Sequence, residues 1–274
     1  MMFSNALVAA LMGVTHLAWT GQAGFIIKSA NGQTLGLDLY LSECVEPVEG
    51  HDGYHRLMPR IVEPRDLQLD VVIATHFHRD HFDIDAIPEL MANGRTRLFC
   101  AYDCMEDVKR LGIDESRVTY VKPGEHYEVG DYLLDFINSD HGAGAPMEVG
   151  VIITVDGKRI LNVGDTSLHL DWKDEYLSAG PLDVLIAPIN GAYGNLNEQE
   201  NVELTKALHP KMTVPAHFGM FASHGGHPGI WRDLILEQIP EQKYKIFTQG
   251  EIIDLLQYKK YITLWQKNLK AKNC

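Results

Sequence analysis

Residues 74–83 read ATHFHRDHFD and continue the apolar run that begins with DVVI at residue 70. Such a run is typical of a buried strand, so His76, His78, Asp80 and His81 lie where a strand ends and a helix begins. Ligands bind at the carboxyl ends of strands in open α/β sheets. Imidazoles and carboxylates are natural ligands for zinc, manganese and iron, and a solvated loop has no reason to prefer histidine to lysine or glutamate. The segment therefore predicts a metal site rather than a polar surface loop.

The H-x-H-x-D-H spacing of these four residues resembles the signature of the metallo-β-lactamase superfamily. The resemblance implies an α/β fold: an αβ/βα sandwich of two mixed sheets, with helices on the outer faces. It also implies three further ligands downstream, each after a later strand. Three positions fit, namely His141 in YLLDFINSDHGAG, Asp165 in RILNVGDTSLH and His217 in KMTVPAHFGMF.

By the same resemblance, two metal ions share the seven side chains. A carboxylate between two cations roughly 3.5–4 Å apart relieves their repulsion and holds a hydroxide in place. The resemblance assigns His76, His78 and His141 to one ion, Asp80, His81 and His217 to the other, and Asp165 to the position that bridges them.

The rest of the sequence alternates strand-like and helix-like segments. Short apolar runs bounded by turn residues predict strands. Helical patterns start only in the middle of the chain, whereas pure βαβ winding would need them from the start, so we expect mixed sheets in one domain that spans 1–274. Residues 43–67 contain three prolines and no periodicity, and we expect a long irregular loop that covers a functional site. The predicted strands are within 24–29, 34–41, 70–76, 96–101, 118–124, 132–139, 150–157, 158–166, 183–190 and 211–217, and the predicted helices within 83–94, 103–113, 197–210 and 227–239.

Composition excludes several classes of partner. The 274 residues carry a net charge of −13, which opposes binding to a phosphate backbone or an anionic membrane surface, so we expect neither nucleic acid nor membrane as partner. The apolar N-terminal stretch MMFSNALVAALMG lacks a basic region and is too short to span a bilayer. The cysteines show neither zinc-type spacing nor the density of a disulfide scaffold, so we expect free thiols in a cytoplasmic protein. They are Cys44, Cys100, Cys104 and Cys274.

Within the superfamily, the chain is similar to the L-ascorbate 6-phosphate lactonase branch. The likeness runs from GQAGFIIKS to VPAHFGMF and is most specific in RLMPRIVEP (56–64), VKPGE (121–125), GDTS (164–167) and GAYGN (191–195). It implies manganese and a site that holds one or two ions. The branch has an aspartate where this chain has Ser-Asp-His, so either Asp140 or His141 is the ligand.

Four other residues are candidates for supporting roles. Asp38, in LGLDLY, either accepts a hydrogen bond from the free N–H of a ligand histidine or faces water. Tyr193, in GAYGN, either contacts substrate or packs as an aromatic residue. His224 and His227 follow His217 closely and either cap a helix or line the mouth of the site.

Four cations are candidates for binding an anionic group of the substrate. Guanidinium groups match phosphate oxygens in geometry, and an ammonium supplies a point charge. The candidates are Arg56, Arg60 and Arg65 in the segment 43–67, and Lys122 in VKPGE.

The predicted chemistry is hydrolysis, because a divalent cation lowers the pKa of a bound water from about 15.7 toward 7. We expect the resulting hydroxide to open a small lactone, with phosphorylated sugar lactones among the candidates, while Asp80 or Asp165 takes the proton. Hydrolysis of a small or lipid phosphodiester is an alternative, because two metals can clamp both oxygens at phosphorus. A metal-holding scaffold or sensor without turnover is a second alternative. Manganese or zinc is the expected metal, the ligand types leave iron open, and a homo-oligomer is left open.

Overall fold

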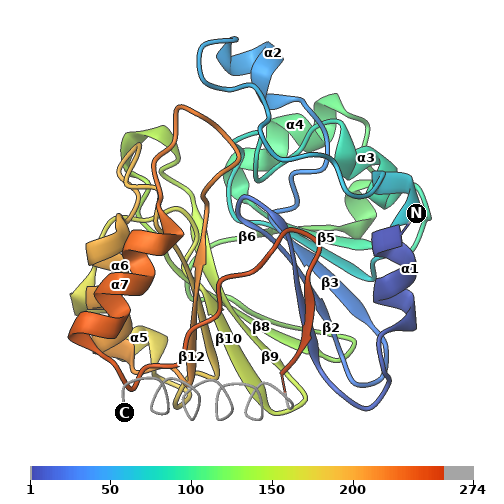
Figure 1. Cartoon of the computed structure of the whole chain (residues 1–274). Helices are drawn as coiled ribbons and strands as arrows, with labels where there is room; N and C mark the ends of the chain where they lie inside the picture. The colour runs from blue at the N-terminus through green and yellow to red at the C-terminus, as the bar shows by residue number, and fades with distance from the viewer. Residues whose placement is uncertain (1, 256–274) are drawn as a thin grey trace.

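The computed structural model describes residues 2–255, which form two β-sheets packed face to face between layers of helices (Figure 1). Both sheets are mixed, as the sequence predicts. The first has the order β13 (Ile252–Asp254), β1 (His16–Gly21), β2 (Gly24–Lys28), β3 (Thr34–Leu37), β4 (Val71–Ala74), β5 (Arg97–Ala101) and β6 (Val118–Val121). The second has the order β12 (Met212–Ala216), β11 (Val184–Pro188), β10 (Lys158–Asn162), β9 (Val149–Val155), β8 (Tyr132–Asn138) and β7 (His126–Val129).

Helices cover the outer face of each sheet, which confirms the predicted sandwich (Figure 1). The first sheet is covered by α1 (Met2–Ala9), α3 (Ala86–Met91) and α4 (Met105–Arg110), and the second by α5 (Lys173–Tyr176), α6 (Glu198–Leu208) and α7 (Pro228–Gln238). The short helix α2 (Val45–Glu49) lies apart from both layers, above one end of the sheets. Single 3₁₀ turns occupy Pro64–Asp66, Tyr102–Cys104, Glu115–Arg117, Gly142–Gly144 and Leu170–Trp172.

The main hydrophobic core lies between the two sheets. Trp19 and Ile27 of the first sheet share one buried cluster with Phe136 and Val151 of the second. Because both faces of each sheet are covered, the central strands are continuous apolar runs rather than alternating ones, and for this reason the sequence marked them clearly. A second buried cluster packs α1, α3 and α4 on the first sheet, and a third packs α5 and α6 on the second.

Local signals fix the ends of several helices. Asn197 and Glu200 form a reciprocal capping box at the start of α6, which ends at His209 in the left-handed conformation. Asp83 accepts hydrogen bonds from the backbone N–H groups of Leu41, Ser42 and Ala86, and so joins the first strands to the start of α3. This aspartate therefore supports the loop that carries the histidine cluster.

Parallel pairing places the loops with the predicted ligands at one end of the molecule. Strands β3 to β6 are parallel in the first sheet, and β10 to β12 are parallel in the second. Their carboxyl ends point the same way in Figure 1, toward α2. No clear sequence signal marks β1, β7, β13, α1, α2 or α5. The segment 43–67, expected to be irregular, contains α2 and one 3₁₀ turn.

The expectation of free thiols holds for Cys44, Cys100 and Cys104, which are buried and unpaired, while Cys274 lies outside the described residues. Among the residues that the structure describes, no helix has the length and apolar character needed to cross a membrane.

Candidate metal centre

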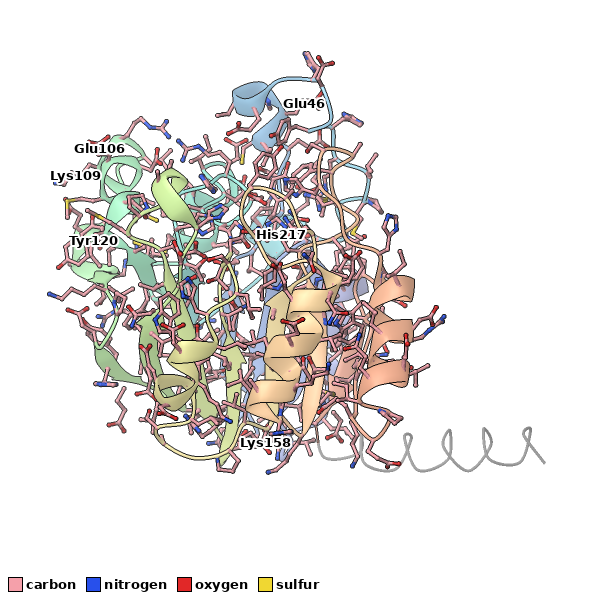
Figure 2. All side chains as sticks on the ribbon, turned by 90° about the vertical axis from the view of Figure 1, so that its left-hand side faces the viewer. Glu46, Glu106, Lys109, Tyr120, Lys158 and His217 are labelled. Carbon is pink, nitrogen blue, oxygen red and sulfur yellow. The ribbon has the colours of Figure 1, made fainter. Side chains whose placement is uncertain are left out.

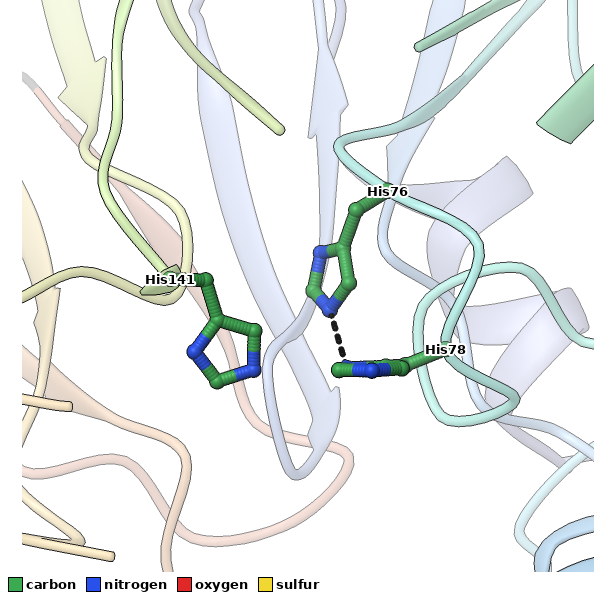
Figure 3. A group of neighbouring side chains, drawn as sticks. All are labelled: His76, His78 and His141. Carbon is green, nitrogen blue, oxygen red and sulfur yellow. Dashed lines mark hydrogen bonds between the residues drawn. The ribbon is translucent and has the colours of Figure 1, made fainter. Parts of the chain in front are cut away.

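The structure brings three of the predicted histidines together (Figure 3). His76 and His78 come from the loop after β4, and His141 comes from the loop after β8 in the opposite sheet. Nε2 of His76 lies 2.9 Å from Nδ1 of His78, and one nitrogen of each ring lies within 4.8 Å of the others. Three imidazole nitrogens that converge from two sheets form a suitable set for one transition metal.

The other four predicted ligands form a second group beside the first. Nε2 of His217 lies 3.0 Å from Oδ2 of Asp165 and 3.3 Å from Oδ2 of Asp80. Nε2 of His81 lies 3.4 Å from the same oxygen of Asp165. That oxygen is also 4.0 Å from Nε2 of His141, so Asp165 lies between the two groups. This is the position that the sequence resemblance implies for a bridging carboxylate.

The structure places Asp38 against the cluster and not toward water. Its carboxylate accepts hydrogen bonds from the backbone N–H and the hydroxyl of Thr75, and Oδ2 lies 3.0 Å from Nδ1 of His81. A carboxylate on the outer nitrogen of a ligand histidine fixes the tautomer and the orientation of the ring. The expectation that Asp38 pairs with a histidine therefore agrees with its observed position.

Sequence reasoning missed three buried residues at the site. Nε2 of Gln22, from the β1–β2 turn, donates to Oδ2 of Asp80, and Nδ2 of Asn195 donates to Oδ2 of Asp165. Glu148, directly before β9, contacts both His76 and the backbone of Asp165. Glutamine, asparagine and glutamate at turns have many uses, so no spacing rule could mark them; GAYGN, which contains Asn195, was noted only as a family likeness.

The buried histidines of the cluster differ in the direction in which their pKa is shifted. Burial lowers the pKa of His76, His78 and His141, that of His78 to about 4, so these imidazoles are neutral as metal ligands must be. Burial acts in the same direction on His217, but the carboxylates of Asp165 and Asp80 outweigh it and raise its pKa to about 9. In the metal-free protein a protonated imidazole at His217 therefore balances the charge of the carboxylates, and a bound cation would displace this proton.

A pocket of about 480 Å³ opens onto the cluster. Its floor includes Asp80, Asp165 and His217, and Figure 2 shows His217 inside the molecule below α2, the helix that carries Glu46. The segment 43–67 contributes part of the roof, which agrees with its predicted role as a cover. The remaining lining is Val45, Glu49, Tyr54, His78, Arg79, His141, Gly142, Ala143, Gly144, Tyr193, Phe221 and His224.

Two loops meet over the mouth of this pocket. The phenol oxygens of Tyr54 and Tyr193 lie 2.6 Å apart, and the rings of both lie beside that of His224. The ring of His224 stacks on His217 at 5.1 Å, and burial lowers the pKa of His224 to about 4. Tyr193 and His224 therefore line the pocket, which favours the substrate-facing alternative for Tyr193 and the mouth-lining alternative for His224. His227 does not, because it is exposed and precedes Pro228 as the N-cap residue of α7.

The predicted cations do not reach the pocket. The guanidinium of Arg56 donates to the backbone carbonyls of Tyr40, Ser42 and Met58, so it holds the cover segment in place. Arg60 and Arg65 are exposed and pair with nearby glutamates, and Lys122 is exposed beside Glu125. None of the four is among the described residues that line the pocket; Arg79 does line it, and its guanidinium pairs with Asp107.

The structure favours one of the two alternatives at the Ser-Asp-His position. His141 is buried in the cluster, whereas the carboxylate of Asp140 turns away. It pairs with Nε2 of His169 at 2.9 Å and accepts hydrogen bonds from Ser167 and the backbone of Gly142.

The backbone around the site is unusual. Among the described residues, six that are not glycine have positive φ, and four of these surround the cluster: Gln22 (53°), Asp38 (47°), Tyr193 (56°) and His217 (57°). Left-handed backbone is unfavourable for residues with a β-carbon, and such residues concentrate at functional sites.

Two mixed sheets with outer helices, and a histidine and aspartate cluster where their strand ends meet, define a metallo-β-lactamase fold. The sequence matches the family described as "Beta-lactamase superfamily domain" over residues 16–217. The chain therefore belongs to the metallo-β-lactamase superfamily.

Individual relatives are distant. A metal-dependent hydrolase of Anaeromyxobacter dehalogenans (strain 2CP-C) is 26% identical over 233 residues, which are 80% of each chain. The isothiocyanate hydrolase from Delia radicum gut bacteria is 20% identical with a TM-score of 0.69, over 87% of this chain and 98% of that one. The diiron β-hydroxylase CmlA of Streptomyces venezuelae is 15% identical with a TM-score of 0.68, over 90% of this chain and 55% of that one. The two structural likenesses show a common fold.

The residues present fit metal ions. The neighbouring nitrogens of His76 and His78, and those of His81 and His217 at 3.3 Å, face one another across gaps that one cation could fill. The donor set of five imidazoles and two carboxylates suits manganese, zinc or iron, and does not distinguish among them.

Proposed function

We propose that the protein is a metal-dependent hydrolase that opens a small, uncharged lactone. One observation carries the proposal: the seven predicted imidazole and carboxylate ligands converge at the floor of a pocket large enough for a small molecule. Five of them, including Asp80 and Asp165, line the pocket, so substrate could reach them directly. This exposure counts against a closed site of purely structural use.

A divalent cation held by these residues would bring the pKa of a water molecule toward neutrality and polarise a carbonyl group. The protein's own groups would do the rest. Asp80 and Asp165 are ionised in the metal-free protein, since His81 and His217 hold the pKa of both carboxyls well below the usual range despite burial, and a bound cation would keep them so; either carboxylate could then accept a proton. Gln22 and Asn195 fix these two carboxylates through single hydrogen bonds.

The substrate class follows from the wall of the pocket. Val45, Tyr54 and Phe221 are apolar or aromatic, Glu49 adds negative charge, and the charge of Arg79 is balanced by Asp107. A phosphorylated substrate would lack the unpaired cations that usually bind such a group. The pocket therefore favours a neutral molecule over the sugar phosphate that the lactonase branch implies.

The choice of a lactone rests on the sequence likeness. Of its four stretches, GDTS contains Asp165, and GAYGN contains Tyr193 and Asn195, so two of them lie at the site. RLMPRIVEP contains Arg56, which anchors the cover segment. The similarity is therefore concentrated in groups that shape the pocket. The relative from Anaeromyxobacter is named a metal-dependent hydrolase, which agrees with the reaction class.

The test is to purify the protein without added metal, measure its metal content, and reconstitute it separately with manganese, zinc and iron(II). Each form is then assayed on three substrates: a neutral sugar lactone, its phosphorylated form and a small phosphodiester. We expect hydrolysis of the neutral lactone with the highest kcat/KM. Cleavage of the diester alone would replace the lactonase proposal with the phosphodiesterase alternative, and metal binding without turnover of any of the three would support a scaffold.

A further inference from the structure

Glu148 lies beneath both groups of the metal centre without belonging to the predicted ligand set. It is 3% exposed and directly precedes β9. Its Oε1 accepts a short hydrogen bond from the backbone N–H of Asp165 and lies 3.4 Å from Nδ1 of His76. Its Oε2 is buried with no hydrogen-bond partner among the described residues.

The contact with His76 is made by the ring nitrogen that does not face His78. Nε2 of His76 faces His78, while Nδ1 faces Glu148 and the hydroxyl of Thr75, which is 3.1 Å away. A ring whose outer N–H is held by such acceptors keeps its inner nitrogen free of a proton and pointed at the metal. Glu148 is thus to His76 what Asp38 is to His81.

The contact with Asp165 involves the backbone and not the side chain. The same oxygen that faces His76 also holds the N–H of Asp165, so one atom links a ligand of the first group to the residue between the groups. Displacement of this oxygen would shift both the ring of His76 and the backbone of Asp165.

The turn before Asp165 is shaped around this carboxyl group. Gly164 has φ +72°, and a β-carbon there would lie 2.4 Å from Oε1 of Glu148. A larger residue at position 164 would therefore displace the carboxyl group or the turn. The Gly-Asp pair that the sequence marked as a ligand turn accordingly depends on a glutamate 16 residues earlier in the chain (164 minus 148).

We propose that Glu148 is a positioning residue that sets the geometry of both metal-binding groups by holding His76 and the backbone of Asp165 through one oxygen. The inference rests on the metal centre of the proposed function. It concerns metal affinity and not the identity of the substrate.

The test compares metal binding by the wild-type chain, Glu148→Ala and Glu148→Gln. Metal-free proteins are titrated with zinc and with manganese in the presence of a competing chelator, and metal per chain is measured after dialysis. Outer partners of ligand histidines typically contribute 10- to 100-fold to metal affinity, so we expect Glu148→Ala to bind about 10-fold or more weakly. Glu148→Gln keeps the volume and the one acceptor oxygen that the proposal invokes, so its affinity should stay close to that of wild type.

A control separates positioning from general destabilisation. Tyr132→Phe removes a buried hydroxyl that donates to the carbonyls of Ile27 and Gln33, far along β8 from His141, and should lower stability without changing metal affinity. If Glu148→Ala does not fold, Glu148→Leu, which keeps most of the volume and has no acceptor oxygen, decides the matter. Wild-type affinity in a folded Glu148→Ala or Glu148→Leu protein would overturn the inference, whereas a wild-type protein that binds no metal would instead refute the proposed function.

Discussion

Replacing Asp38 tests how much the metal centre depends on residues that do not bind metal. The fully buried carboxylate accepts hydrogen bonds from the N–H of Thr75 at 2.8 Å and its hydroxyl at 2.9 Å, and it lies 3.0 Å from Nδ1 of His81. Asp38→Ala leaves three buried donors without an acceptor, at about 1–3 kcal/mol each, and puts alanine in left-handed backbone at about 1 kcal/mol more. The expected loss is therefore about 4 kcal/mol or more, a large part of the stability of an ordinary domain.

Asp38→Asn is the sharper variant, because asparagine tolerates left-handed backbone and keeps an oxygen for the N–H of Thr75. The amide nitrogen that replaces Oδ2 cannot accept from the hydroxyl of Thr75 or from His81. We expect a loss of about 2–3 kcal/mol in the free energy of unfolding and a 10- to 100-fold loss of metal affinity.

The assay is urea unfolding of the metal-free proteins, followed by tryptophan fluorescence, together with a chelator competition for metal affinity. Asp156→Asn is the matched control. Asp156 also has positive φ, and its carboxylate accepts from Thr15 and from the backbone of Ala30, but it is exposed and outside the site. If Asp38→Asn lowered stability and metal affinity no more than Asp156→Asn does, the reasoning would be refuted.

Three further predictions can be checked directly. His141→Ala should lose metal from the three-histidine group, measured as metal per chain, whereas Asp140→Ala should keep wild-type content; the reverse result would reassign the ligand. Burial raises the pKa of Asp103 to about 6 in the folded protein. Ionisation of this carboxyl therefore destabilises the fold increasingly as the pH rises from its pKa in the unfolded chain toward its pKa in the folded protein. In urea unfolding at about pH 7.5, Asp103→Asn should therefore be more stable than wild type by on the order of 1–2 kcal/mol, since the side chain is partly exposed. Near pH 4 the variant should have no advantage. Equal stability of the variant and wild type at both pH values would contradict this. Tyr54→Phe removes the contact with the Tyr193 phenol across the pocket mouth, and should change KM for the lactone more than metal content; an unchanged KM would show that the contact is not used.

The sequence predicted the fold well where strands are buried on both faces. Runs such as VVIA in β4 and VLIAP in β11 carry their own signal, because each position is apolar whichever way it points. Of the missed strands, β7 and β13 are edge strands with partly exposed residues, whereas β1 is buried but its sequence, HLAWTG, mixes polar and apolar residues and so forms no apolar run. The helices α2 and α5 are only 5 and 4 residues long, too short for a periodic pattern.

The candidate ligands could be proposed from the sequence because the first four lie within six residues and the others follow strands. The residues that hold these ligands in place could not be predicted from the sequence. Glu148 and Gln22 reach the cluster from a strand start and a hairpin turn, and only the packing of two sheets brings them there. The predicted anion-binding role of Arg56 and Lys122 failed for a related reason: sequence shows a charge but not which carbonyl or carboxylate already engages it.

The left-handed backbone at Gln22, Asp38, Tyr193 and His217 has a consequence for how this chain would change over generations. Each left-handed conformation costs about 1 kcal/mol or more of folding free energy, and we expect the chain to keep these residues because the site uses their side chains. Glycine at Asp38 would leave the donors of Thr75 and His81 unpaired, so a descendant that no longer needs the site should accumulate glycine first at Tyr193, whose side chain is 56% exposed. The same replacement made in the laboratory, Tyr193→Gly, should raise the melting temperature, whereas Asp38→Gly should lower it.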